Sequence, residues 1–400
     1  LLVGLSQILF PVVLIIGLTG LLVGVLQSYD HFTIPAISPA VWNVVIIVLL
    51  VVLRPHFHGG YEDGNQLHAY AIAILAATFV QLLLAFAALR RIDFRLQFHL
   101  DWHDPRVRRV FTLMMPVTIG LGIVNLDQLI NSLFGTLVNK EAPRAIETAF
   151  RVYMLPQGLF SVAVATVLFP TLSRMAHARE VGSMRRAVGT GMRQINLLLI
   201  PSAAFMIALP RPIVRLLFER GHFNAASTHL VAIALFWFAF SLPFGGLNLL
   251  FTRTFFAVQR PWIPTSLAAV NIVVDIVVSV GLYRPLGVPG LIIGTLAANL
   301  VMAGLQLERL RRGLNGRVEG AQTAMITARI TLAAVLLGVV SWSVWRLLET
   351  ALGSSLPAQL VSVGVAGVAG VVVYARAVLA MGVPEAHQVS RLVRAQLGRA

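Results

Sequence analysis

Residues 241–274 read SLPFGGLNLLFTRTFFAVQRPWIPTSLAAVNIVV, and this stretch decides the fold. It contains two long apolar runs that are separated by a short polar turn near residues 259–261. A chain segment in lipid must satisfy its own backbone polar groups, so each run is expected to be a helix rather than an open strand. About 20 residues are needed to cross the hydrocarbon core. The stretch therefore predicts two neighbouring transmembrane helices joined by a tight turn.

The composition of the whole chain agrees with a membrane protein. Of its 400 residues 58% are hydrophobic and only 12% are charged, and the mean hydropathy is +0.83. Soluble domains carry about 25% charged residues. The chain has no cysteine, which excludes a disulfide framework and a cysteine-ligated metal. We attribute the net charge of +15 to arginines that fix membrane topology, not to nucleic-acid binding.

Apolar segments along the chain predict an all-α polytopic membrane protein with eleven spans. The spans are residues 8–27, 34–53, 68–89, 110–138, 148–173, 188–210, 227–257, 262–283, 288–308, 324–347 and 357–380. Loops that follow the odd-numbered spans, with the C-terminal tail, hold 18 Lys and Arg residues, whereas the remaining loops hold 7. Because positive residues favour the cytoplasmic side, this bias predicts a cytoplasmic C-terminus.

The opening stretch repeats an earlier part of the chain, residues 9–45. The matched features are Pro35 with Pro264, Asn43 with Asn271, LAATFV (75–80) with LAANLV (296–301), and Arg90-Arg91 with Arg311-Arg312. Three similar segments in the same order (the opening stretch, the six-residue run and the arginine pair) predict that the first three spans repeat as spans seven to nine, in the same orientation. Parallel repeats of this kind are a known plan of transporters.

The repeat also predicts the domain organisation. Residues 1–100 would be the remainder of an N-terminal lobe, residues 101–313 a C-terminal lobe of six helices, and residues 314–400 two additional helices with a tail. Because Leu1 lies inside an apolar run, we expect a fragment that lacks roughly the first three of fourteen helices.

Acidic residues inside the predicted spans are informative, because a charge at the bilayer centre costs about 2.5–3.5 kcal/mol. Asp275 lies mid-span, and Asn271 one turn earlier shares its helix face. Asp127 is similarly deep, with Asn131 one turn on, and Thr295 lies early in the ninth span. Their oxygens are hard ligands that suit Na⁺ or a proton. The alternative is that a hydrogen bond or an arginine neutralises each aspartate.

Arginines in the spans have two interpretations. Arg151, near the outer end of the fifth span, is suited to bind a phosphate in a cavity, because a guanidinium binds phosphate bidentately. Alternatively, it pairs with Glu147 one turn earlier or extends to the interface. For Arg193 and Arg253, near predicted cytoplasmic ends, we expect extension to the interface. The sequence carries no P-loop, HExxH motif or nucleophile elbow.

The motif in the fifth span resembles a known family. Residues 151–174 read RVYMLPQGLFSVAVATVLFPTLSR, and together with residues 28–45 and 255–265 they are similar to the MurJ (MviN) lipid II flippase family. This family belongs to the multidrug/oligosaccharidyl-lipid/polysaccharide exporter superfamily. The resemblance implies fourteen helices in two six-helix lobes around a central cavity, with a lipid-facing groove formed by the two helices of residues 314–400.

The resemblance also implies site residues and a function. Arg151 would help to hold the pyrophosphate of the substrate, and a Na⁺ site would be formed by Asp127, Asn271, Asp275, Thr295 and the Leu291 carbonyl. The implied function is translocation of lipid II across the bacterial plasma membrane by a monomer, coupled to Na⁺ or membrane potential, without another cofactor.

Alternatives to this function are export of an O-antigen-type lipid-linked oligosaccharide and export of a small drug. Another is a purely structural membrane protein, which would not explain isolated acidic residues in mid-span. A membrane enzyme acting on lipid-linked sugars would need acidic groups on sizeable outer loops, and the predicted outer loops are short and carry no paired carboxylates.

Overall fold

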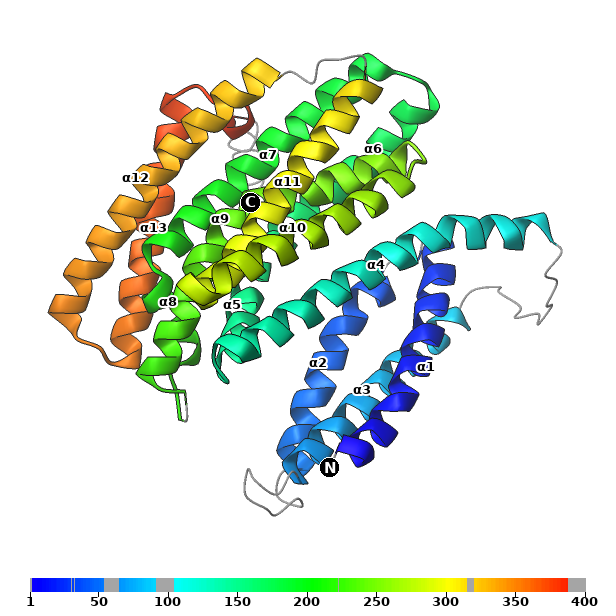
Figure 1. The fold of residues 1–400 in the computed structure, drawn as a ribbon, viewed down its shortest axis with the longest axis horizontal. Coiled ribbons are helices and arrows are strands. Elements are labelled where there is room, and N and C mark those ends of the chain that lie inside the picture. Colours follow the sequence, from blue (N-terminus) through cyan, green and yellow to red (C-terminus); the bar gives the residue numbers. More distant parts are fainter. Residues whose placement is uncertain are drawn as a thin grey trace, which may run out of the picture. The chain divides into compact units, whose positions relative to one another are not determined.

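The computed structural model describes residues 2–29, 31, 33–53, 65–90, 104–221, 223–314 and 320–387. The described residues form helices and contain no strand, as predicted. The chain divides into two compact units, Leu1–Asp101 and Trp102–Ala400, which are described separately below (Figure 1). The predicted division of the second unit at residue 314, into a lobe and two additional helices, stays a prediction.

The first unit is a bundle of three helices. These are α1 (Leu2–Ser28), α2 (Thr33–Leu53) and α3 (Asn65–Leu89), and α3 packs against both α1 and α2. Neutral hydrogen bonds join α2 to α3. Trp42 Nε1 donates to Thr78 Oγ1 at 3.1 Å, and Gln81 Nε2 donates to Ser38 Oγ at 2.8 Å. Such bonds between polar side chains help helices to associate in lipid, where apolar surface alone supplies little driving force.

The second unit is built around two long central helices, α7 and α9. Its elements are α4 (Pro105–Val138), α5 (Ala142–Pro156), η2 (Gln157–Ser161), α6 (Val162–His177), α7 (Val181–Ala208), α8 (Pro210–Phe218), α9 (Ala225–Ala257), α10 (Trp262–Leu286), α11 (Val288–Gly313), α12 (Gly320–Leu352) and α13 (Leu356–Ala380). The core includes the fully buried Leu199, Leu235 and Phe251, and α9 packs against α5, α7 and α11.

Three helices of the second unit pack as α1, α2 and α3 do in the first. Helix α11 packs extensively against both α9 and α10, whereas α9 and α10 touch each other little. The same holds for α3 with α1 and α2. Gly290 permits the close approach of α10 and α11, since a Cβ there would lie 2.3 Å from the Leu282 carbonyl oxygen. This shared packing pattern supports the predicted repeat.

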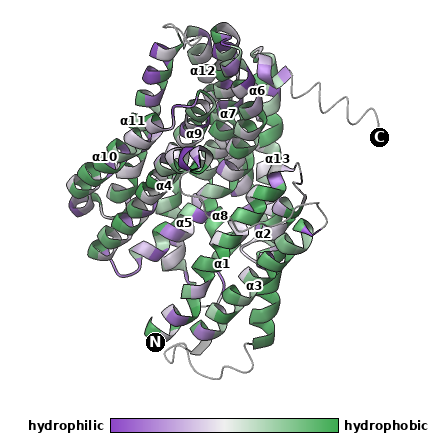
Figure 2. Ribbon diagram, turned by 90° about the vertical axis from the view of Figure 1, so that its right-hand side faces the viewer, coloured by the Kyte–Doolittle hydropathy of each residue, from purple (hydrophilic) through white to green (hydrophobic). Residues whose placement is uncertain are grey.

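Ten helices of the described residues are long and apolar enough to cross a membrane. They correspond to ten of the eleven predicted spans, and Figure 2 shows hydrophobic residues along most of α1 and α3. The remaining predicted span, 110–138, falls within α4, a helix of 34 residues in which several side chains lie outside the described residues. The segment Leu129–Val138 of α4 is a shorter apolar helix.

Two elements of the second unit are absent from the sequence prediction. The predicted span 148–173 is not one regular helix, because a π-helical turn at η2 follows Pro156 and separates α5 from α6. Turns of this kind insert one extra residue into a helix. Helix α8 is an amphipathic helix of nine residues that buries Ile213 and Val214 and is too short to be found by a search for spans.

Candidate functional site

Asp275 of α10 is 2% exposed, and three neutral donors surround its carboxylate. Asn131 Nδ2 of α4 donates to Oδ2 at 2.9 Å, and Thr295 Oγ1 of α11 donates to the same oxygen at 3.3 Å. Ser279 Oγ, one turn further along α10, donates to Oδ1 at 3.0 Å. No basic side chain within the described ranges forms an ion pair with Asp275. A carboxylate buried among neutral groups costs free energy unless a cation joins it.

The absence of a side chain at Gly294 makes this arrangement possible. A Cβ at Gly294 of α11 would lie 2.1 Å from Ser279 Oγ and 2.5 Å from Asp275 Oδ1. The close approach of the two helices also brings Ser279 Oγ to 3.3 Å from the Leu291 carbonyl oxygen. Small residues commonly allow such close helix contacts in membranes. The result is a cluster of oxygen atoms from α10 and α11 around one carboxylate.

The structure brings together three of the five positions that the resemblance implies for a cation site. Asp275, Thr295 and the Leu291 carbonyl share the cluster, as described above. Asn271 is half-buried one turn before Asp275 and makes no hydrogen bond to another described residue. The side chain of Asp127 lies outside the described residues.

Two further contributors to the cluster, Asn131 and Ser279, are not among the implied ligands. Asn131 shows that α4 passes the site, because its amide contacts the Asp275 carboxylate. The signal for Ser279 is its spacing of four residues after Asp275, which places both on one helix face.

The oxygen cluster has the chemistry of a site for a hard monovalent cation. Carboxylate, carbonyl and hydroxyl oxygens are the ligands that such cations prefer, and all three kinds meet here. Among the described residues there is no group of three or more His, Asp or Glu side chains that could hold a metal ion. The residues present therefore fit Na⁺ better than a transition metal.

Arg151 lies on the face of α5 opposite its buried residues. Its side chain is 74% exposed, and Nη2 lies 2.6 Å from Oε1 of Glu147, which is 64% exposed. The buried face of α5 is formed by residues that include Ala145, Ala149 and Val152. The structure therefore shows the pairing with Glu147 that was one of the alternatives. An exposed pair contributes little stability, so the guanidinium stays available to an anion.

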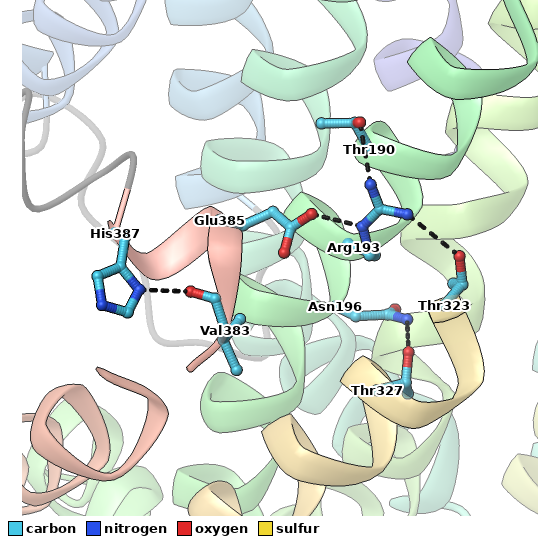
Figure 3. Close-up of polar contacts among 8 residues, drawn as sticks. All are labelled: Thr190, Arg193, Asn196, Thr323, Thr327, Val383, Glu385 and His387. Carbon is cyan, nitrogen blue, oxygen red and sulfur yellow. Dashed lines mark hydrogen bonds and ion pairs between the residues drawn. The ribbon is translucent and has the colours of Figure 1, made fainter. Parts of the chain in front are cut away.

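Arg193 of α7 is a buried residue, and the expectation that it extends to the interface is wrong. It is 6% exposed and forms an ion pair with Glu385, in a short segment after α13 (Figure 3). Its guanidinium also donates to Thr190 Oγ1 at 3.2 Å and to Thr323 Oγ1 at 3.5 Å. Arg253, in contrast, is exposed. We call Arg193 and Glu385 the α7 ion pair.

Comparison with known proteins identifies the family. The family model described as "Lipid II flippase MurJ" matches residues 1–361. The chain belongs to the MurJ lipid II flippase family. It is 30% identical to the probable lipid II flippase MurJ of Rhizobium meliloti over 353 residues, which cover 86% of this chain and 65% of the relative. The corresponding protein of Bdellovibrio bacteriovorus is 26% identical over 392 residues, 97% of this chain and 72% of the relative.

Solved structures show the same fold. A lipid II flippase MurJ in an inward closed conformation superposes with a TM-score of 0.72 at 20% identity, over 94% of this chain and 73% of that one. An inward-facing multidrug resistance MATE family transporter of the MOP superfamily superposes with a TM-score of 0.64 at 16% identity, over 78% and 71%. With ten apolar helices among its described residues, this MurJ family member is a multi-pass protein of the bacterial inner membrane.

Proposed function

We propose that the protein containing this chain flips lipid II from the cytoplasmic to the outer leaflet by alternating access. The observation that carries this proposal is the MurJ family match over residues 1–361. The match covers 65% of the length of its Rhizobium relative, and the activity of the whole protein is therefore part of this proposal. Translocation requires no covalent chemistry, and we therefore propose a transporter rather than an enzyme. Its partners are lipid II and the bilayer, and it acts as a monomer without nucleic acid.

Arg151 is proposed to hold the pyrophosphate of lipid II. A pair of exposed charges on a membrane helix is stable only where it meets water or a polar cavity, not lipid. The exposed guanidinium on α5 therefore suits a headgroup cavity, and its donors match phosphate oxygens. Glu147 would hold the guanidinium in place until the substrate competes for it.

The Asp275 cluster is proposed to bind Na⁺ as the coupling ion. The ligands would be the Asp275 carboxylate, the Leu291 carbonyl and the hydroxyls of Ser279 and Thr295. A bound cation would balance the buried charge and so favour the conformation in which α4, α10 and α11 meet. It can shift the cycle only by the difference between its affinities for the two conformations. Membrane potential remains the alternative driving force, since a charged site also responds to voltage.

The remaining parts of the proposal concern the tail and the orientation. The helices of residues 314–400 would form the lipid-facing groove along which the polyprenyl tail travels. The C-terminus would lie in the cytoplasm, which the charge bias of the loops supports.

Reconstituted full-length protein tests the proposal. Lipid II that has reached the outer face of a vesicle can be counted with an enzyme that acts only there. We expect Arg151→Ala to reduce the translocation rate at least about tenfold, because a charge-assisted bond to the pyrophosphate is lost. Arg144→Ala is the matched control, since Arg144 is also exposed on α5, two turns earlier. Equal rates in the two variants would contradict the role of Arg151, and no translocation by the wild type would contradict the function.

An alternative cargo is another lipid-linked oligosaccharide or a small drug. The likeness to a MATE family transporter favours keeping this alternative, although it shows the fold alone. Competition in the same vesicles separates the cargoes. Lipid II should block its own labelled transport, whereas a cationic drug should not.

A further inference from the structure

A groove with a volume of about 660 Å³ runs along one flank of α12. Residues of α7, α11 and α12 line it, and α13 contributes none. It is therefore separate from any groove formed between the last two helices. Helix α12 presents one face to it from Gly320 to Val335, which is about 22 Å at 1.5 Å per residue. That length matches one leaflet with its headgroup region, given a hydrocarbon core about 30 Å thick.

The groove changes from polar to apolar along α12. At the end where α12 begins, Arg311 of α11 and Thr323 line it, and Thr327 follows one turn deeper. At the other end Leu332 and Val335, which are 61% and 57% exposed, line the groove beside Thr331, whose hydroxyl donates to the Thr327 carbonyl oxygen. A solvent-exposed apolar face of this kind on a membrane-spanning helix faces lipid. The groove therefore has the polarity of an amphiphile with its head at the start of α12.

At the polar end of the groove, several hydrogen-bond donors have no acceptor among the described residues. Thr327 Oγ1 accepts from Asn196 Nδ2 at 3.0 Å, and Thr323 Oγ1 accepts from Arg193, so both hydroxyl hydrogens remain free to donate (Figure 3). Arg311 has no carboxylate partner in the described part of the chain, whereas its neighbour Arg312 pairs with Glu308. One cation and two hydroxyl donors form a complementary set for a phosphate.

We propose that this groove binds a glycerophospholipid of the leaflet at the start of α12. Its phosphate would accept from Arg311, Thr323 and Thr327, and one acyl chain would lie along Leu332 and Val335. The lining residue Ala328 leaves space for that chain. Because the lipid would touch both α11 and α12, it would strengthen the junction between these two helices. By the charge bias of the loops, this is the cytoplasmic leaflet.

Native mass spectrometry of the full-length protein with phosphatidylglycerol tests this proposal. We expect Arg311→Gln to weaken lipid binding about tenfold, because a charge-assisted contact is lost. Arg312→Gln removes the same charge one residue away and should change the affinity less than about twofold. Ala328→Phe on the exposed face of α12 should also weaken lipid binding, by filling the acyl path. Thermal unfolding without lipid verifies that each variant is folded.

Three outcomes would overturn the proposal. Equal losses in the two arginine variants would show diffuse attraction to basic residues. Competition by glycerol 3-phosphate at the same concentration as the lipid would show an anion site without acyl recognition. Unchanged phosphatidylglycerol binding in Arg311→Gln and Ala328→Phe would leave the groove to another occupant, such as a partner's membrane helix.

Discussion

Two buried charged sites in the second unit differ in how their charge is balanced. Asp275 is 2% exposed and is surrounded by neutral donors from three helices. The α7 ion pair is equally buried, with Arg193 at 6% and Glu385 at 3% exposed, but each charge faces its opposite. A paired charge already has its counter-charge, whereas an unpaired carboxylate gains from a mobile cation. We therefore propose a structural role for the ion pair and a functional role for Asp275.

The largest expected effect comes from breaking the α7 ion pair. Arg193→Met leaves Glu385 buried without a counter-charge, and Glu385 Oε2 already lacks a hydrogen-bond partner. We expect a loss of about 3–5 kcal/mol in unfolding free energy, as for other broken buried pairs. Thermal unfolding of the purified protein measures it. Arg312→Met, in an exposed pair, is the control, and a similar melting temperature in both variants would contradict the structural role.

Crowding the Asp275 cluster is expected to have the next largest effect. In Gly294→Ala the new methyl group would overlap Ser279 Oγ, so α10 and α11 must separate. We expect a loss of about 1–3 kcal/mol, as for overpacked cores, together with loss of any sodium response. The control is Gly281→Ala on α10, where a Cβ meets nothing within 4 Å. If Gly294→Ala melted like the control, the close helix contact would not matter.

Removing the charge of Asp275 should abolish the stabilisation that sodium gives to the folded protein. A ligand at 10 to 100 times its dissociation constant stabilises the folded state by about 1–3 kcal/mol. We expect NaCl, relative to KCl, to raise the unfolding free energy of the wild type by this amount and to leave that of Asp275→Asn unchanged. Melting curves in the two salts at equal ionic strength provide the measurement. A sodium-specific gain that survives in Asp275→Asn would place the cation elsewhere.

The smallest effect is expected when both members of the ion pair are replaced. Arg193→Met combined with Glu385→Leu removes both charges and the unsatisfied carboxylate oxygen. Replacing a complete buried pair by apolar residues is often close to neutral, so we expect the double variant within about 1 kcal/mol of the wild type. A double variant as unstable as Arg193→Met alone would mean that Arg193 acts through its bonds to Thr190 and Thr323 instead.

Local pattern predicts most of this fold, because apolar runs of about 20 residues identify membrane helices without knowledge of their neighbours. Because this pattern is local, it does not predict features that are shorter than a span or that depend on distant residues. Helix α8 is shorter than any span, and the π turn at η2 has no hydropathy signal. Two distant partners could not be predicted in this way, since Glu385 is 192 residues from Arg193 and Asn131 is 144 residues from Asp275.

The candidate site was also only partly predictable from the sequence. Residue type alone suggested Thr295 as a partner of Asp275, and the resemblance to a family added the Leu291 carbonyl. In the structure Thr295 donates to Asp275, whereas the Leu291 carbonyl lies near Ser279 Oγ. The first unit shows why the internal repeat alone could not identify the residues of this site. The position that matches Asp275 there, counted from Asn43 and Asn271, is Ile47, which is 61% exposed. The charged cluster around Asp275 lies between α10 and α11. Among the described residues, the hydrogen bonds between α2 and α3 join neutral side chains only.

The most direct test is lipid II translocation by full-length protein in vesicles, compared in sodium and in potassium, for the wild type and Asp275→Asn. Equal amounts of folded protein must be reconstituted, with membrane potential clamped. The account predicts faster translocation in sodium for the wild type and a slow, sodium-independent rate for Asp275→Asn. A variant that kept both the wild-type rate and its sodium dependence would contradict the assignment of Asp275 as the coupling site.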